Sequence, residues 1–184
     1  GAITVIKELP PHVVTAHLAI AELIFASVIL ALVWTKSPRT ILISPDQKKL
    51  VTLVLLGILG TYIVILSGSY IVGNGSGPSC PSWPLCDGGI FPSTSSGLVH
   101  MSHRIIAGIT SLLIGYLCFY IFTNRDLPRI IRITGIHIGV FFALQILVGA
   151  ANPWSQFSPI FKALHLSLAT ALWGGIVVLL GLLW

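Results

Sequence analysis

The sequence predicts an all-α integral membrane protein with five transmembrane helices. Hydrophobic residues make up 55% of the 184 residues and charged residues only 8%, whereas about 25% of the residues of a soluble domain are charged. The apolar residues recur in five stretches, each long enough to cross a hydrocarbon core of about 30 Å as a helix. Strands are excluded for these stretches, because an open sheet in lipid would leave backbone groups without hydrogen bonds.

The stretches predict helices over residues 11–34, 50–72, 98–122, 130–151 and 160–184. Basic residues concentrate in the first and third of the segments that connect them. These residues are Lys36, Arg39, Lys48 and Lys49 with one acid, Asp46, in the first link, and Arg125, Arg129 and Arg132 with Asp126 in the third. Segments 73–97 and 152–159 contain no Lys or Arg.

This charge distribution predicts the topology, because basic loops stay in the cytoplasm. We expect the N-terminus and the 73–97 loop outside a prokaryotic plasma membrane, and the C-terminus in the cytoplasm. The net charge of +5 is then a topology signal, and we expect no nucleic-acid partner.

Two of the three cysteines, Cys80 and Cys86, lie in the proline-rich 73–97 loop. With His100 and His103 they could form a metal-binding cluster. An extracytoplasmic location favours a disulfide instead, because thiols are oxidised there. Cys118 lies within an apolar stretch and is expected to be a small buried side chain.

The first predicted helix is similar to the last. The segment His17-Leu18-Ala19-Ile20-Ala21 aligns without a gap with His165-Leu166-Ser167-Leu168-Ala169, and Gly1-Ala2 aligns with Gly149-Ala150 at the same offset. Chance similarity is the alternative in so apolar a chain. Because membrane proteins often duplicate a unit, we interpret residues 1–36 as the last helix of a preceding, absent four-helix unit. Residues 37–49 are then a cytoplasmic link, and residues 50–184 a complete four-helix unit.

Three histidines lie at matched depth in the predicted helices. His103 and His165 are each the sixth residue of their helix and His17 the seventh, which places them about 7–10 Å from the outer end. Polar residues within a membrane are costly and indicate function, and a heme needs two imidazoles from facing helices. We expect His103 and His165 to be the axial iron ligands of a b-type heme, and His17 to ligate iron in the absent unit. The alternative is a hydrogen bond between helices at each position.

Four further polar residues have expected roles. The Arg104 guanidinium can pair with heme carboxylates or anchor the helix at lipid headgroups. His100 lies one turn before His103, and we take it as the candidate catalytic residue for proton transfer. Glu22 is expected to be neutral through burial or bonded to the absent unit, and Gln145 to form a hydrogen bond between helices.

Read in order, five motifs resemble those of heme A synthase, the enzyme family of cytochrome oxidase assembly. They are Gly-x-x-x-x-x-Asn74-Gly75-Ser76-Gly77, Cys80-Pro-Ser-Trp83-Pro84-Leu-Cys86, His100-x-x-His103-Arg104, Gln145-x-x-x-Gly149-Ala150 and Ala163-Leu-His165-Leu. The match spans the last four predicted helices, and the first helix is similar to the closing helix of the family's other half. The cysteine and His-Arg motifs are specific together, whereas each alone is weak.

The resemblance implies an oxidoreductase of two pseudosymmetric four-helix halves. One half binds heme b, and the other oxidises a methyl group of heme O to the formyl group of heme A. His103, His165 and His17 match iron ligands, and Cys80 and Cys86 match a pair that assists heme transfer or redox steps.

Which half the chain represents stays open. The family's catalytic half has Glu where this chain has His100, which favours the heme b half, but an intact cysteine pair is typical of the substrate half. A non-catalytic heme-binding or electron-transfer subunit is the alternative function. Expected partners are heme, the absent half, membrane lipid, heme O synthase or other cytochrome oxidase assembly factors, and a second copy of the chain.

Overall fold

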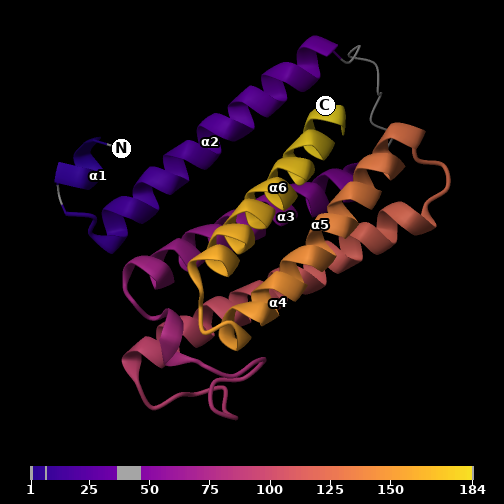
Figure 1. Cartoon of the computed structure of the whole chain (residues 1–184). Helices are drawn as coiled ribbons and strands as arrows, with labels where there is room; N and C mark the ends of the chain where they lie inside the picture. The colour runs from indigo at the N-terminus through magenta and orange to yellow at the C-terminus, as the bar shows by residue number, and fades with distance from the viewer. Residues whose placement is uncertain (1, 7, 37–46, 184) are drawn as a thin grey trace.

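The computed structural model describes residues 2–6, 8–36 and 47–183, which form helices joined by turns and one long loop (Figure 1). The elements are α1 (Ala2–Ile6), α2 (Pro11–Lys36), α3 (Gln47–Gly73), the 3-10 turn η1 (Gly77–Ser79), α4 (Ser95–Thr123), α5 (Arg129–Trp154) and α6 (Pro159–Leu183). Within these residues, the five helices α2 to α6 are long and apolar enough to cross a membrane. The predicted fold class is confirmed.

Helices α2 to α5 cover their predicted spans and are slightly longer at one or both ends, and α6 begins one residue before its predicted start. The hydropathy of the sequence does not reveal the polar turns at the ends of these helices, because those turns are stabilised by interactions other than apolar burial. Helix α4 begins at Ser95 because the Thr94 side chain caps it, accepting a hydrogen bond from the Gly97 amide at 3.1 Å. Two residues of the predicted 37–49 link, Arg39 and Asp46, lie outside the described residues. Residues 47–49 of that link belong to the first turn of α3. Trp184, at the end of the last predicted helix, also lies outside the described residues. The short helix α1 was not predicted.

Helices α3, α4, α5 and α6 form an antiparallel four-helix bundle in which each helix packs against two others. Fully buried apolar side chains fill the half of the bundle that lies away from the 74–94 loop. They include Leu50, Val54, Ile114, Leu117, Ile121, Ile131, Ile138, Ile176, Leu179 and Leu183. The other half, called the loop end below, holds the predicted ligands His103 and His165.

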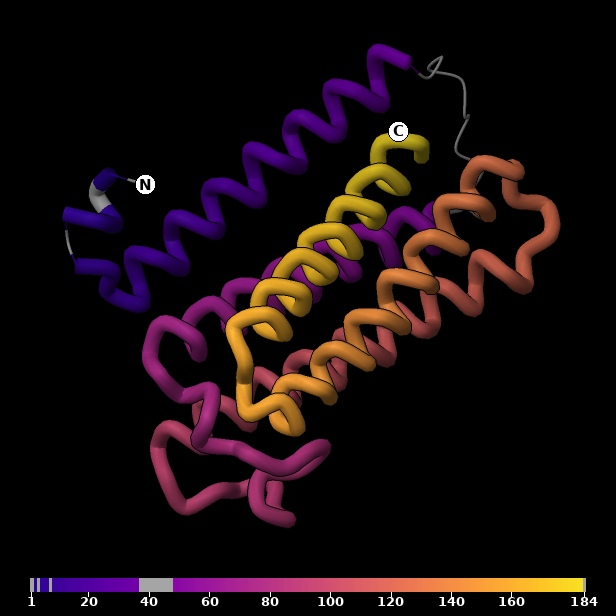
Figure 2. The backbone as a smooth tube through the Cα atoms, in the orientation of Figure 1, coloured from indigo at the N-terminus to yellow at the C-terminus, as the bar shows by residue number. Residues whose placement is uncertain are grey.

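Helix α2 lies outside this bundle and packs on α3 and α6 (Figure 2). It runs in the same direction as α6. The Thr170 hydroxyl donates to Glu22 Oε1 at 2.6 Å, and these two residues are 148 positions apart. A Cβ added at Gly181 would lie 3.1 Å from Val33 Cγ1, and this pair has the same offset.

Contacts between equivalent positions are what two helices related by a local two-fold axis would make. The α2–α6 packing is of this kind, and the interpretation of α2 as a copy of α6 stays a prediction. One oxygen of the buried Glu22 carboxyl bonds within the chain, while Oε2 has no partner among the described residues, so the expectation for Glu22 stays a prediction.

Candidate functional site

The Cys80–Cys86 disulfide closes a small ring in the 74–94 loop, with an S–S distance of 2.04 Å. This confirms the predicted pairing. The chain then turns back at Asp87 and Gly88, which have φ angles of +50° and +83°, while Cys86 and Gly89 exchange backbone hydrogen bonds of 3.1 and 3.0 Å. Two positive φ angles in a two-residue turn suit an Asp-Gly pair. Met101 of α4 packs beneath the two sulfurs.

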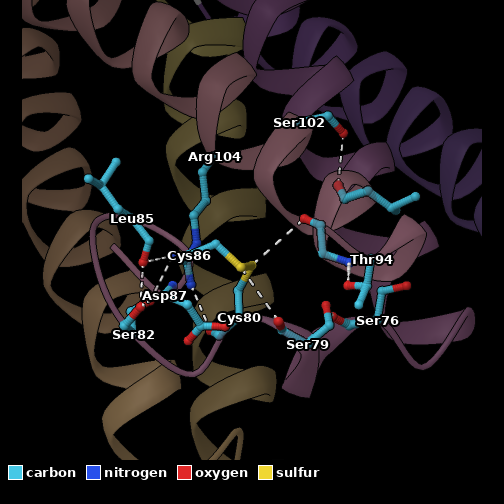
Figure 3. Close-up of a disulfide and its surroundings, with 12 residues drawn as sticks. Ser76, Ser79, Cys80, Ser82, Leu85, Cys86, Asp87, Thr94, Ser102 and Arg104 are labelled. Carbon is cyan, nitrogen blue, oxygen red and sulfur yellow. Dashed lines mark hydrogen bonds between the residues drawn. A yellow bond between two sulfur atoms is a disulfide. The ribbon is translucent and has the colours of Figure 1, made fainter. Parts of the chain in front are cut away.

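Arg104 points from α4 into the disulfide ring (Figure 3). Its guanidinium donates hydrogen bonds to four backbone carbonyls, namely Ser82 at 2.7 Å, Cys80 at 3.0 Å, and Pro84 and Leu85 at 3.2 Å each. A planar guanidinium has five N–H donors in a fixed fork, so one side chain holds the whole ring against α4. The predicted pairing of Arg104 with a heme carboxylate stays a prediction.

His103 is held by two consecutive residues of α3. Its Nδ1 lies 2.8 Å from the Ser67 hydroxyl oxygen. A Cβ added at Gly68 would lie 3.2 Å from His103 Cε1, so only a glycine leaves the ring its present space. The imidazole thus has a polar contact on one edge and a glycine backbone at another.

His165 occupies a comparable position between α6 and α5. A Cβ added at Gly149 would lie 2.9 Å from His165 Cε1, a distance that real side chains do not adopt. Its Nε2 lies 3.4 Å from the Gln145 side-chain nitrogen, which confirms the expected contact of Gln145 with a neighbouring helix. Its Nδ1 is buried and has no hydrogen-bond partner.

Both predicted heme ligands therefore lie at the loop end, one on α4 and one on α6, and each ring rests on a glycine. Among the described residues, no three His, Cys, Asp or Glu side chains gather as they would around a bare metal ion. Two imidazoles without further protein ligands are instead the donor set that a heme iron accepts.

Unpaired polar atoms also concentrate at the loop end. In the described part of the chain, buried side-chain atoms without a hydrogen-bond partner include His100 Nδ1, Gln145 Oε1, Asn152 Oδ1 and His165 Nδ1. Buried polar groups are normally paired. A group of unpaired ones around two histidines fits a site built for a ligand with polar substituents, and heme is such a ligand.

His100 lies one turn from His103, buried beneath the loop. Its ring meets that of Phe157 edge-on, with ring centroids 5.6 Å apart. Phe157 belongs to the α5–α6 turn and has a φ angle of +57°. The assignment of His100 as a catalytic residue stays a prediction.

The structure does not bring His17 to this site. Its side chain is exposed on α2, outside the four-helix bundle. This location agrees with a role toward a different unit, which likewise stays a prediction.

Sequence reasoning missed Ser67 and Phe157 as parts of the site, and gave no role to the two glycines. Gly68 opens the first motif quoted above, and Gly149 is the next-to-last residue of the fourth. Their presence in motifs was therefore a signal, but their contact with imidazoles becomes visible only once the helices are packed. Ser67 gave no signal of its own, because serines are common in this chain.

The chain is similar in sequence to known proteins of one family. The sequence profile of the COX15-CtaA family, described as cytochrome oxidase assembly protein, matches residues 1–177. The heme A synthase of Bacillus licheniformis is 31% identical over 129 residues, covering 67% of this chain and 43% of the relative. The heme A synthase of Bacillus cereus strain AH187 is 32% identical over 125 residues, covering 66% of this chain and 40% of the relative.

The chain thus spans less than half the length of these curated relatives. The family profile matches nearly the whole sequence. The matched residues include the disulfide loop and most of the five membrane-spanning helices. The chain belongs to the COX15-CtaA family of cytochrome oxidase assembly proteins.

Proposed function

We propose that residues 50–184 bind a b-type heme between His103 and His165, as one unit of a heme A synthase. The observation that carries this proposal is the matched placement of the two imidazoles, each against a glycine of the adjacent helix. Two imidazoles from different helices of a bundle are suited to axial ligation. When bound, the heme would supply the redox chemistry, while the protein holds and orients it.

Arg104 is proposed to pair with a heme carboxylate as well as with the loop. All its hydrogen bonds within the described residues go to uncharged carbonyls, and its Nε donates none of them. A partly buried charge without a counter-charge is costly. The free Nε–H and the second hydrogen of Nη2 could accommodate an anion, as guanidinium groups do with carboxylates.

The proposed reaction of the whole enzyme oxidises a methyl group of heme O to the formyl group of heme A. This change takes up one oxygen atom from water and releases four hydrogens as protons and electrons, which two equivalents of a two-electron acceptor must receive. His100 is proposed to hold or pass a proton at the loop end, where its Nδ1 has no other partner.

We further propose that α2 closes a preceding four-helix unit and that His17 is an iron ligand there. The two-fold-like contacts between α2 and α6 support this proposal. The basic links favour a plasma-membrane orientation with the disulfide loop outside. Lipid, the preceding unit, assembly factors such as heme O synthase and a second copy of the chain remain the proposed partners.

The test uses His103→Ala and His165→Ala in membranes that contain the whole protein. Each variant should lose the low-spin b-type absorbance, and extracted pigments should show heme O or its hydroxylated form in place of heme A. His137→Ala is the matched control, because this exposed histidine bonds to Ile133 O of its own helix at 3.0 Å. Normal absorbance in both ligand variants would refute the heme-binding proposal.

A second candidate is a heme-binding electron carrier without catalytic activity. The imidazole at His100 favours it, because the oxidising half of the resembled family has a carboxylate at this place. In that case the ligand variants would lose the b-type absorbance, while heme A would persist at the control level. The pigment analysis therefore separates the two candidates.

A further inference from the structure

The Ser67 hydroxyl makes two contacts at once. Its oxygen lies 2.9 Å from the Val64 carbonyl oxygen on its own helix and 2.8 Å from His103 Nδ1. Among the described residues, these are its hydrogen bonds, and the contact to Ser67 is the hydrogen bond of His103. The position of the Ser67 hydroxyl hydrogen therefore determines which nitrogen of the His103 imidazole carries a hydrogen.

A hydroxyl group has one hydrogen to donate and two lone pairs that accept. A carbonyl oxygen can only accept, so the Ser67 hydrogen points to Val64. With its hydrogen on Val64, the Ser67 oxygen accepts from His103, which then carries a hydrogen on Nδ1; in the opposite tautomer the hydroxyl would donate to Nδ1 instead. A neutral imidazole carries one hydrogen, and its Nε2 is left with a free lone pair.

We propose that Ser67 is a positioning residue that fixes His103 in its Nδ1–H form and so leaves Nε2 as the iron ligand. This inference rests on the proposed heme-binding function. Gly68 complements Ser67, since it leaves space for the Cε1 edge of the same ring. Hydroxyl and glycine together set both the tautomer and the position of the imidazole.

The two proposed ligands, His103 and His165, differ in whether their Nδ1 has a hydrogen-bond partner. His165 Nδ1 has no hydrogen-bond partner, and its Nε2 is 3.4 Å from Gln145 Nε2. A ligating imidazole that donates its other N–H becomes more basic, and loss of such a partner lowers metal affinity about 10- to 100-fold. His103 is thus the ligand prepared for binding, whereas His165 must first give up its contact with Gln145.

The tautomer can be measured without heme. In the heme-free whole protein labelled with 15N-histidine, His103 should show a protonated Nδ1 and an unprotonated Nε2. Ser67→Ala should lose this preference, and Ser67→Thr, which keeps a hydroxyl, should retain it. A His103 that carries its hydrogen on Nε2 in the unaltered protein would overturn the proposal.

The second measurement is heme affinity and the midpoint potential of the bound heme. Ser67→Ala should keep the low-spin absorbance but bind heme about 10- to 100-fold more weakly. Its midpoint potential should rise, by about 59 mV for each tenfold change in the ratio of ferric to ferrous affinity.

The matched control is Ser102→Ala. Ser102 directly precedes His103 and bonds to the Val99 carbonyl at 2.8 Å, as Ser67 does to Val64, but it is exposed and, within the described residues, its side chain forms no hydrogen bond to a histidine. Equal heme affinities and potentials in Ser67→Ala and Ser102→Ala would overturn the role of Ser67 alone. Absence of a low-spin b-type heme from the unaltered protein would instead refute the proposed function.

Discussion

At the scale of single residues, the site depends on two glycines as much as on its histidines. An imidazole is flat and wide, and it can lie between two membrane helices only where one of them has no side chain. Small residues serve close helix packing in membranes generally. Here the space left by Gly68 and Gly149 is taken by a ring edge and not by a second backbone.

Gly149→Ala should disturb heme binding more than Gly68→Ala does. The added methyl group would lie 2.9 Å from His165 Cε1 in the first variant and 3.2 Å from His103 Cε1 in the second. Overpacking of this kind costs about 1–3 kcal/mol, and the ring must turn to relieve it. The measurement is heme absorbance per protein after purification.

Gly108→Ala is the control for these variants, because a Cβ there meets no atom within 4 Å. It should bind heme normally and gain up to about 1 kcal/mol in helix propensity. Equal heme loss in all three variants would point to helix stiffening and not to contact with the imidazoles.

At the scale of helices, buried polar pairs show how α2 is attached to the bundle. Glu22 is 3% exposed, and its only hydrogen bond within the described chain comes from Thr170. A second link joins α2 to α3, since the Tyr62 hydroxyl donates to Ala19 O at 3.1 Å. Since lipid is as apolar as these helices, such bonds and close packing hold membrane helices together.

Thr170→Val should weaken the α2–α6 contact, because it keeps the shape of the side chain and removes the donor. A buried carboxyl left without its partner costs about 1–3 kcal/mol, whereas removing both partners is nearly neutral. Thermal unfolding in detergent should therefore show a lower midpoint for Thr170→Val and partial recovery in the double variant with Glu22→Leu. Ser27→Ala is the control, because the exposed Ser27 bonds within its own helix, to Leu23 O. A double variant less stable than Thr170→Val would contradict this account.

The helices themselves were predictable from the sequence, but the contacts between them were not. Hydropathy gives spans such as 98–122 because crossing a membrane demands a long apolar run. The disulfide followed from the charge of the links, which predicts that Cys80 and Cys86 lie on the oxidising side. The bonds of Arg104 to loop carbonyls and of Glu22 to Thr170 depend on which helix faces meet, and neither charge nor periodicity specifies that.

At the scale of the whole molecule, the two ends of the bundle differ in the side chains that they contain. The end away from the loop is a closed core of aliphatic side chains next to three arginines, Arg125 in the α4–α5 link and Arg129 and Arg132 in the first turn of α5. The loop end contains His100, His103 and His165, four of the buried polar atoms without a partner in the described residues, and the disulfide ring. A dense core at one end gives the helices fixed positions, so that the side chains at the other end can be held for binding.

The orientation of these two ends in the membrane can be tested with one added cysteine at each. Positive-inside topology places the loop end outside, because residues 73–97 carry no Lys or Arg. In a Cys118→Ala background, Ser93→Cys should react with a membrane-impermeant maleimide in intact cells. Asp126→Cys, on the arginine-containing link, should react only after the membrane is permeabilised. Both positions are exposed, so accessibility within the fold does not limit either reaction. The reverse labelling pattern would place the disulfide and the proposed heme site on the cytoplasmic side, where thiols are kept reduced.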